Sequence, residues 1–363
     1  MLSCVEFKEV ENDIIQMMRR KSLIPVIGAG FTKNCASRSG KVPSGDDYLK
    51  YMIDQIVIDT KGAMSEDELK KESFSSVSSV YHKVVSEDKQ YSYLNCSFTK
   101  VKLDSIKKEF LEVDWPYIYT LNIDDAIENN SEYGTVLYAN REIRNTVFEQ
   151  NKCVIKLHGD IADILAYQDS NCEIFDQRQY VVSIKKNAAL LNKLTHDYEF
   201  LNLIYIGCGL SDEIDLLFST SVARDNNNAR YFCTTTVPSA LEQVKLESYG
   251  ITHCIVFKTF DEIYNQIKVA YDKALGIAPD ELENFSTYTF YELEEGFDIN
   301  KPYLFQGKSI LDNTRVATFP YFFVSREVTD IVVNNINSKG TQIVVGRGCS
   351  GKTYLAYDVI KRV

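Results

Sequence analysis

The sequence predicts an α/β fold built on a doubly wound parallel sheet, and two observations support this prediction. Over residues 20–275, short apolar runs alternate with polar or amphipathic stretches, which is typical of parallel strands separated by helices. The runs are mostly apolar throughout, as expected for strands that helices cover on both faces. The predicted strands are residues 23–27, 117–121, 153–157, 203–206, 230–233 and 254–257.

Helices are expected before and between these strands. Residues 5–20 place apolar side chains at helical spacing, which predicts an amphipathic helix packed on the sheet. Residues 65–112 are rich in Ser, Lys and Glu, consistent with a small helical insertion between the first and second predicted strands. A helical pattern over residues 260–275 ends the first predicted domain, residues 1–276.

The composition favours a globular, cytoplasmic protein. The chain has 363 residues, of which 45% are apolar and 12% aromatic, enough for two ordinary cores. A net charge of -11 disfavours broad contacts with nucleic acid or anionic membranes, because such contacts need clustered Lys and Arg. The nine cysteines form no C-x-x-C pair, and no leader or long apolar run is found near Met1. We therefore expect reduced thiols, no structural zinc, no nucleic acid partner and no membrane partner.

The first predicted strand leads into Gly28-Ala29-Gly30. Two glycines here are explained equally well by a tight strand-to-helix turn or by a phosphate site. In a phosphate site, small residues let the backbone approach the anion, and the N-terminus of the next helix faces it. Thr32 could supply one more donor. Lys33 stands where a dinucleotide fingerprint carries its third glycine, which argues against an ordinary dehydrogenase.

Polar side chains follow the second and third predicted strands. Asn122 and Asp124 come after residues 117–121, and His158 comes after residues 153–157. Asn and Asp are also favoured helix N-caps, and a lone histidine at a strand end is often structural. The carboxyl ends of parallel strands, however, meet at one edge of a sheet. We therefore expect these side chains to share one ligand crevice.

The order of four motifs resembles that of sirtuin-type NAD-binding domains. The motifs are Gly28-Ala-Gly30, Thr120-Leu-Asn-Ile-Asp124, Leu157-His-Gly-Asp160 and Gly207-Cys-Gly-Leu-Ser-Asp212, and residues 174–180 also resemble the segment after the histidine in the bacterial branch. The resemblance covers about residues 20–275 and implies a Rossmann-like domain. It implies that Asn122 and His158 are catalytic, with His158 as the base. The residues that it implies for NAD binding are Gly28, Ala29, Gly30, Phe31, Thr32, Asp124, Gly207, Gly209 and Ser211.

The cysteines depart from the pattern of the deacylases in this family. Those enzymes carry a four-cysteine zinc module, and the cysteines here are too scattered to build one, so no metal is expected at the NAD site. The resemblance then implies a hydrolase that cleaves the nicotinamide–ribose bond of NAD, with water as acceptor. The main alternative is a module that binds NAD or ADP-ribose without turnover and regulates an NTPase. A deacylase or ADP-ribosyltransferase is a third interpretation.

The sequence near Val363 fits the phosphate-loop pattern G-x-x-x-x-G-K-[ST]. A predicted strand, residues 341–345, precedes Gly346-Arg-Gly-Cys-Ser-Gly351-Lys352-Thr353, and a helix is predicted after it. In such a loop Lys352 reaches the β- and γ-phosphates of ATP and Thr353 ligates Mg²⁺. We expect residues 277–319 to form a connector and residues 320–363, with a helix over 328–336, to form the N-terminal fragment of a P-loop NTPase domain.

Residues 323–327 and the phosphate loop resemble the start of a STAND-type NTPase. A sirtuin-like effector joined to such a switch is similar to antiphage defence proteins of the sirtuin–STAND class. This resemblance implies a homo-oligomer that ATP and Mg²⁺ assemble, and a phage protein as the trigger, acting through a C-terminal region beyond Val363. NAD depletion would then stop the infected cell from supporting phage.

Overall fold

The computed structural model describes residues 2–138, 152–167, 175–210, 213–223, 228–276, 289–292, 316–319 and 327–339, and four residues after position 354. The chain divides into two compact units, Met1–Gly276 and Ile277–Val363. Each unit is described by itself.

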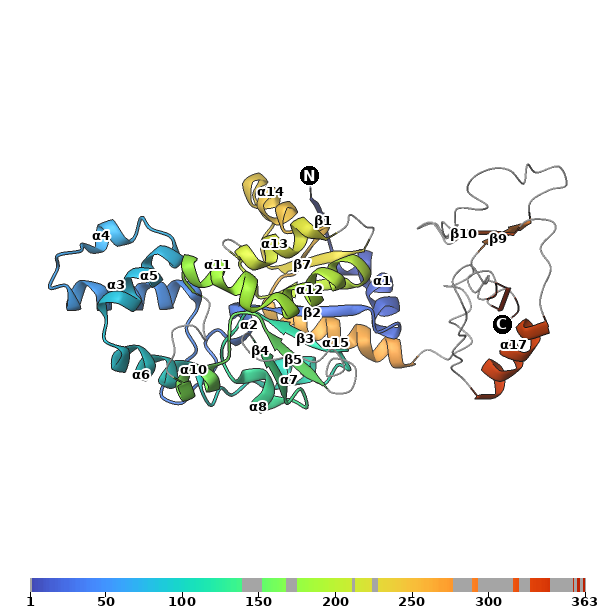
Figure 1. Ribbon diagram of the computed structural model, residues 1–363, viewed down its shortest axis with the longest axis horizontal. Helices are drawn as coiled ribbons and strands as arrows, with labels where there is room; N and C mark the ends of the chain where they lie inside the picture. Colours follow the sequence, from blue (N-terminus) through green and yellow to red (C-terminus); the bar gives the residue numbers. More distant parts are fainter. Residues whose placement is uncertain are drawn as a thin grey trace. The chain divides into compact units, whose positions relative to one another are not determined.

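The first unit contains a parallel sheet of eight strands among its described residues (Figure 1). The strands are β1 (Ser3–Val5), β2 (Leu23–Ile27), β3 (Ile118–Thr120), β4 (Thr135–Tyr138), β5 (Cys153–Lys156), β6 (Asn202–Ile206), β7 (Arg230–Thr234) and β8 (His253–Val256). Their order is β1-β8-β7-β6-β2-β3-β5-β4, and every neighbouring pair is parallel. The predicted α/β, Rossmann-like class is confirmed.

The six predicted strands are all found, and the structure adds β1 and β4 at the two edges of the sheet. The chain runs from β2 to β3 on one side and later returns to β6 on the other side of β2. Ligands bind in the crevice outside the carboxyl ends of the strands where the order reverses in this way. The topology therefore directs attention to the loops after β2, β3, β5 and β6.

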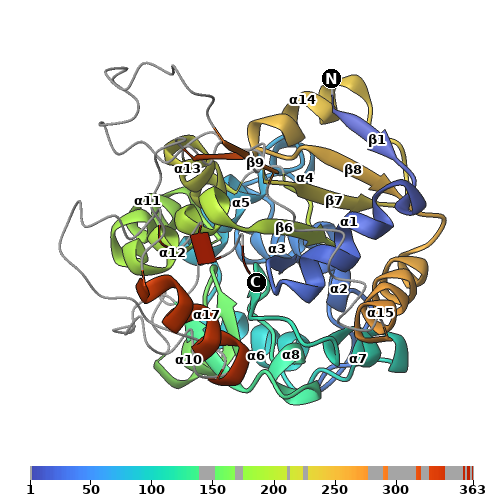
Figure 2. The ribbon, with the colours of Figure 1, turned by 90° about the vertical axis from the view of Figure 1, so that its right-hand side faces the viewer.

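Helices cover both faces of the sheet. On one face α1 (Phe7–Arg19), α7 (Ser105–Leu111) and α15 (Phe260–Gly276) pack together, and on the other face α11 (Gln177–Lys186), α12 (Ala188–Phe200) and α13 (Ile214–Val222) do so. Figure 2 shows α11, α12 and α13 to the left of the strands and α1 and α15 to the right. The predicted first helix is found as α1, whose apolar side chains are buried, including Phe7 and Ile14.

A helical lobe is inserted between β2 and β3. It consists of α3 (Gly45–Asp59), α4 (Glu66–Leu69), α5 (Phe74–Val84) and α6 (Glu87–Phe98), and lies beyond the sheet at the left of Figure 1. The insertion starts about twenty residues earlier than predicted, because the capping box of Ser44 and Asp47 starts α3. Aromatic rings fill the lobe; those of Tyr48 and Tyr93 stack with their centroids 5.3 Å apart.

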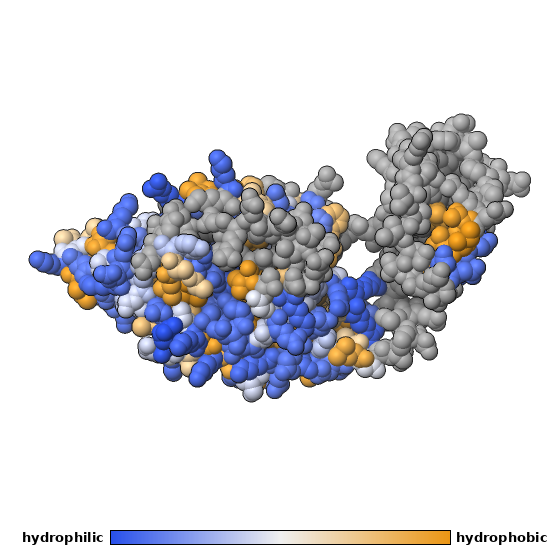
Figure 3. Space-filling model, turned by 60° about the horizontal axis from the view of Figure 1, so that its bottom comes forward, coloured by the Kyte–Doolittle hydropathy of each residue, from blue (hydrophilic) through white to orange (hydrophobic). Residues whose placement is uncertain are grey.

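Four shorter helices complete the described part of the first unit: α2 (Ala29–Thr32), α8 (Ala126–Asn130), α10 (Ile161–Tyr167) and α14 (Ala240–Ser248). Within the described ranges, no helix combines the length and the apolar character that crossing a membrane requires. On the face that Figure 3 shows, hydrophilic side chains dominate and the apolar ones form small separate patches.

In the second unit, β9 (Thr289–Glu292) pairs in parallel with β10 (Val316–Phe319), and α17 (Glu327–Lys339) follows. The helix predicted over residues 328–336 is thus found. The predicted connector differs from the structure, because it contains β9 and β10. Both are rich in the β-branched and aromatic residues that favour strands. The phosphate loop, with Gly346, Gly351, Lys352 and Thr353, lies outside the described residues.

Candidate functional site

A cavity of about 690 Å³ lies at the carboxyl ends of β5, β3, β2, β6 and β7. Its volume is within the usual range for small-molecule and cofactor sites. Nearly all of the sequence-predicted site residues line it together: Gly28, Ala29, Gly30, Thr32, Asn122, Asp124, His158, Gly207 and Gly209. The expected crevice is therefore present. The helical lobe contributes an aromatic wall to it, with Tyr48, Phe74 and Phe98.

Two predicted residues stand apart from this set. The side chain of Phe31 is fully buried in the core, with its ring 5.8 Å from that of Phe110 and 5.5 Å from that of Tyr264. It therefore cannot contact a ligand in the cavity. Ser211 lies outside the described residues.

The glycines bring two turns into direct backbone contact. A Cβ atom on Gly28 would lie 2.6 Å from the main-chain oxygen of Gly207, and one on Gly30 would lie 2.9 Å from its Cα. Gly207 itself has φ +67°, and a Cβ there would lie 2.6 Å from the nitrogen of Phe31. Larger residues would separate the β2 turn from the β6 turn. The tight-turn interpretation therefore applies to all three glycines.

Two main-chain N–H groups of the β2 turn donate hydrogen bonds within the protein. The N–H groups of Gly28 and Gly30 donate to the main-chain oxygens of Ile206 and Gly207, at 2.9 and 2.8 Å. The next helix, α2 (Ala29–Thr32), has four residues, too few for a substantial helix dipole. By contrast, apart from its two chain neighbours, no heavy atom of the described residues lies within 4 Å of a Cβ built on Gly209. The β6 turn thus leaves more room for a ligand than the β2 turn.

Asn122, Thr32 and Asp124 form a chain of hydrogen bonds on the cavity wall. The Nδ2 atom of Asn122 donates to the main-chain oxygen of Gly28 at 3.2 Å and to Oγ1 of Thr32 at 3.1 Å. Thr32 in turn donates to Oδ2 of Asp124 at 2.8 Å. A carbonyl oxygen only accepts, so the contact with Gly28 settles which amide atom of Asn122 is nitrogen. Oδ1 of Asn122 carries no hydrogen bond among the described residues and remains for a ligand.

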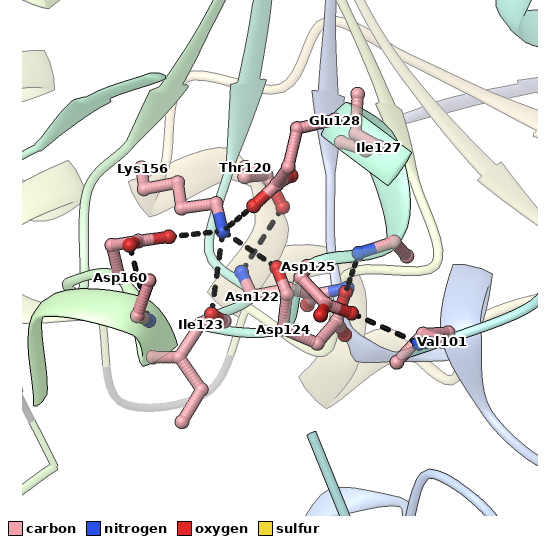
Figure 4. Close-up of polar contacts among 12 residues, drawn as sticks. Val101, Thr120, Asn122, Ile123, Asp124, Asp125, Ile127, Glu128, Lys156 and Asp160 are labelled. Carbon is pink, nitrogen blue, oxygen red and sulfur yellow. Dashed lines mark hydrogen bonds and ion pairs between the residues drawn. The ribbon is translucent and has the colours of Figure 1, made fainter. Parts of the chain in front are cut away.

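The side chain of Lys156 anchors this wall through several polar contacts (Figure 4). Its side chain is fully buried on β5, and its Nζ atom lies 2.5 Å from Oε1 of Glu128 and 2.6 Å from Oδ1 of Asp160. The same atom donates to the main-chain oxygens of Ile123 and Asp124, at 3.3 and 2.6 Å. One ammonium therefore ties β5 to the segment that carries Asn122.

Burial and charge shift the pKa values in this cluster. Burial raises the pKa of Asp124, against the opposing effects of the Lys156 ammonium and the Thr32 hydrogen bond. Burial also raises the pKa of Glu128 to about 7. For Lys156 itself, burial lowers the pKa, but Glu128 and Asp160 outweigh this and the net shift is upward. Lys156 is therefore an ammonium at neutral pH.

His158 pairs with a carboxylate that sequence reasoning missed. Its Nε2 atom lies 3.1 Å from Oδ2 of Asp215, and the two side chains are 5% and 1% exposed. The ring of Tyr180 meets the imidazole at 88°, with centroids 5.5 Å apart. Asp215 lies in the first turn of α13. Acidic residues are favoured there because they interact with the helix dipole, so the sequence alone gives no reason to assign Asp215 to the site. Lys156 was missed too, although a lysine inside an apolar strand was a visible signal.

None of the described cysteines is in a disulfide bond. Among the described residues, no group of three or more His, Cys, Asp or Glu side chains is arranged to hold a metal ion.

A comparison with protein families agrees with this arrangement. Residues 116–254 match the family model described as SIR2-like domain. This part of the chain is thus similar to sirtuins, and the match supports a sirtuin-like domain, whose class implies NAD binding and NAD-related activity. The matched range contains Asn122, Asp124, His158 and Asp215. No curated protein sequence matches the chain.

Proposed function

We propose that the first unit is an NAD hydrolase that cleaves the nicotinamide–ribose bond and releases nicotinamide and ADP-ribose. The observation that carries this proposal is the meeting of Asn122, Asp124 and His158 in one cavity at the reversal of strand order. The similarity to SIR2-like domains supports NAD as the ligand. The cavity is lined by residues at the ends of neighbouring strands, which lie about 4.8 Å apart in a sheet, so a ligand as long as a dinucleotide can contact several of them.

The proposed reaction breaks the bond between the nicotinamide nitrogen and C1′ of the ribose. The bonding electrons leave with nicotinamide, which departs as a neutral ring, and C1′ becomes oxocarbenium-like. The oxygen of a water molecule then bonds to C1′, and its proton moves to a base. Such a transition state needs positioning and electrostatic stabilisation more than a strong acid.

The wall residues suit these steps. Oδ1 of Asn122 accepts a hydrogen bond from the attacking water or a ribose hydroxyl, while its Nδ2 atom is held by Gly28 and Thr32. Asp124 fixes Thr32 and through it Asn122. His158 accepts the proton. Lys33, which lines the cavity and is exposed, is a cation available to the diphosphate.

The test is the fate of NAD. The purified full chain is incubated with NAD in the presence of ATP and Mg²⁺, and nicotinamide and ADP-ribose are quantified by chromatography. We expect equal amounts of both products, and a loss of about 100-fold or more in His158→Ala and Asn122→Ala. The matched controls, His196→Ala and Asn129→Ala, change exposed residues outside the cavity and should retain turnover.

Other results would point elsewhere. Unchanged turnover in both cavity variants would remove the proposed roles of Asn122 and His158. Binding of NAD or ADP-ribose without turnover would favour the regulatory module. Transfer of label from NAD to a protein or an acyl group would favour a transferase or a deacylase.

The wider role is proposed from the sequence motifs. We propose that the hydrolase is activated when an ATP- and Mg²⁺-dependent switch forms a homo-oligomer, and that it depletes NAD in antiphage defence after a phage protein is recognised. The test uses a protein that includes the expected region beyond Val363. Its NAD turnover and its size on gel filtration are each measured with and without ATP and Mg²⁺. Full activity of a monomer in both conditions would contradict it.

A further inference from the structure

We propose that Asp215 is a positioning residue that holds His158 with its proton on Nε2, so that Nδ1 is the atom that acts as base in the cavity. The chemical meaning of this assignment rests on the proposed hydrolase function. The tautomer itself is a property of the protein without NAD, so the two can be tested separately.

The tautomer follows from the contacts of Asp215. A carboxylate only accepts hydrogen bonds, so the 3.1 Å contact between its Oδ2 atom and Nε2 of His158 requires a proton on Nε2. Its other oxygen, Oδ1, accepts from the N–H of Leu216 at 3.0 Å. Because the first turn of α13 anchors the carboxylate in this way, it cannot rotate without losing a hydrogen bond in a buried place.

The other ring nitrogen is left for the cavity. His158 lines the cavity, and no hydrogen bond of its Nδ1 atom is found in the part of the chain that the structure describes. The edge-to-face contact with Tyr180 of α11 restricts rotation of the imidazole. In a neutral imidazole protonated on Nε2, Nδ1 carries the lone pair that can accept a proton.

The charged groups near the imidazole of His158 also favour its role as a base. Burial lowers the pKa of His158, but the charge and hydrogen bond of Asp215, helped by the charge of Glu213, raise it above its ordinary value. Asp215 lies in α13, Glu213 directly precedes that helix, and Tyr180 faces the ring from α11. The carboxylate therefore both orients the ring and increases its basicity.

The variant Asp215→Asn keeps the shape of the side chain at position 215 but changes the hydrogen bond that it makes to His158. Its amide oxygen would be needed to accept from the N–H of Leu216, which turns the NH₂ group toward His158. That group donates, so Nε2 would become the acceptor and the proton would move to Nδ1. In hydrolases with a Ser-His-Asp triad, the same change of aspartate to asparagine produces the wrong tautomer and costs about 10⁴ in kcat.

The first experiment uses no NAD. The full chain, which contains four histidines, is labelled with ¹⁵N in the histidine rings, and its nitrogen NMR spectrum is recorded. The signal that is missing in the His158→Gln variant belongs to His158. We expect the Nε2-protonated tautomer in the natural chain and the Nδ1-protonated tautomer in Asp215→Asn. A natural chain with its proton on Nδ1, or a tautomer that Asp215→Asn leaves unchanged, overturns the proposal.

The second experiment measures kcat/KM for NAD against pH. Asp215→Asn should lose about 100-fold or more, and in Asp215→Ala the acid limb of the profile should move to lower pH, because the carboxylate no longer raises the pKa of His158. The matched control is Asp197→Asn, which changes a buried carboxylate of α12 that contacts Tyr117, Tyr119 and Lys193 outside the cavity. The Asp197→Asn variant should be less stable than the natural chain but should keep the acid limb of the kcat/KM profile at the same pH. If the natural chain turns over no NAD even with ATP and Mg²⁺ present, the hydrolase proposal fails, while the NMR result still decides the tautomer.

Discussion

The ammonium nitrogen of Lys156 lies 2.6 Å from the main-chain oxygen of Asp124. This contact joins the strand that leads to His158 to the loop that carries Asn122. The same nitrogen binds the carboxylates of Glu128 and Asp160, so its position is defined from several directions. The distance between the amide and the imidazole of the candidate site therefore depends on one buried charge.

Replacing Lys156 by Met should be strongly destabilising. The change leaves the carboxylates of Glu128 and Asp160 buried without their cation, which costs about 3–5 kcal/mol when a buried ion pair is broken. We also expect weaker NAD binding, because the Asn122 loop loses its anchor. Denaturant unfolding and calorimetry measure the two effects. The control is Lys89→Met, whose exposed ion pair with Asp59 should contribute less than about 1 kcal/mol.

Much of the fold could be predicted because buried parallel strands have a simple signature. The run Leu23–Ile27 is apolar at every position, and its predicted bounds are those of the strand. The strands that the sequence does not predict, Ser3–Val5 and Thr135–Tyr138, each pair with one neighbour at an edge of the sheet and are three and four residues long. Runs of three or four residues are too short to show a strand period, so the sequence alone does not distinguish them from a loop.

The sequence predicts the site residues that directly follow a strand. It does not predict those whose role depends on a contact with a residue far away in the sequence. Asn122 and His158 can be found because each directly follows an apolar run. Asp215 lies 57 positions from His158 along the chain, and nothing local in the sequence records that pairing. The roles of Gly28 and Gly30 are ambiguous for the same reason, because their close contact is with Gly207, on a different strand.

Gly207→Ala and Gly209→Ala should behave differently, although the two glycines are two positions apart. At Gly207 an added Cβ meets a left-handed backbone and the nitrogen of Phe31 at 2.6 Å, so we expect a loss of about 1–3 kcal/mol or more. At Gly209 the space is open, so stability should change little. If a ligand approaches the β6 turn closely, Gly209→Ala should weaken NAD binding without lowering the melting temperature. A destabilised Gly209→Ala would contradict the described geometry.

Thr32→Val tests the chain of hydrogen bonds through its middle member. Valine keeps the shape but leaves the buried Oδ2 atom of Asp124 without its donor, at a cost of about 1–3 kcal/mol. Asn122 would keep only its bond to Gly28, so its amide should be less well held and NAD turnover should fall. Thr32→Ser retains the hydroxyl and is the matched control. Equal turnover in Thr32→Val and the natural chain would show that the hydroxyl does not position Asn122.

The pairing of His158 and Asp215 should make stability depend on pH with a defined sign. Burial lowers the pKa of His158, but Asp215 outweighs this, so the folded-state pKa lies above the unfolded value of 6.5. A raised histidine pKa means that the folded state binds more protons than the unfolded state between those two values. The stabilisation is therefore fully present below pH 6.5 and is lost as the pH rises through the folded-state pKa.

Urea unfolding of the natural chain and of His158→Gln, at about pH 6 and pH 9, measures this effect. The free-energy difference between the two proteins should be larger at the lower pH, by about 1.4 kcal/mol for each unit of pKa shift. If His158→Gln lost more stability at pH 9 than at pH 6, burial would dominate the pair, and the folded-state pKa of His158 would lie below the unfolded value.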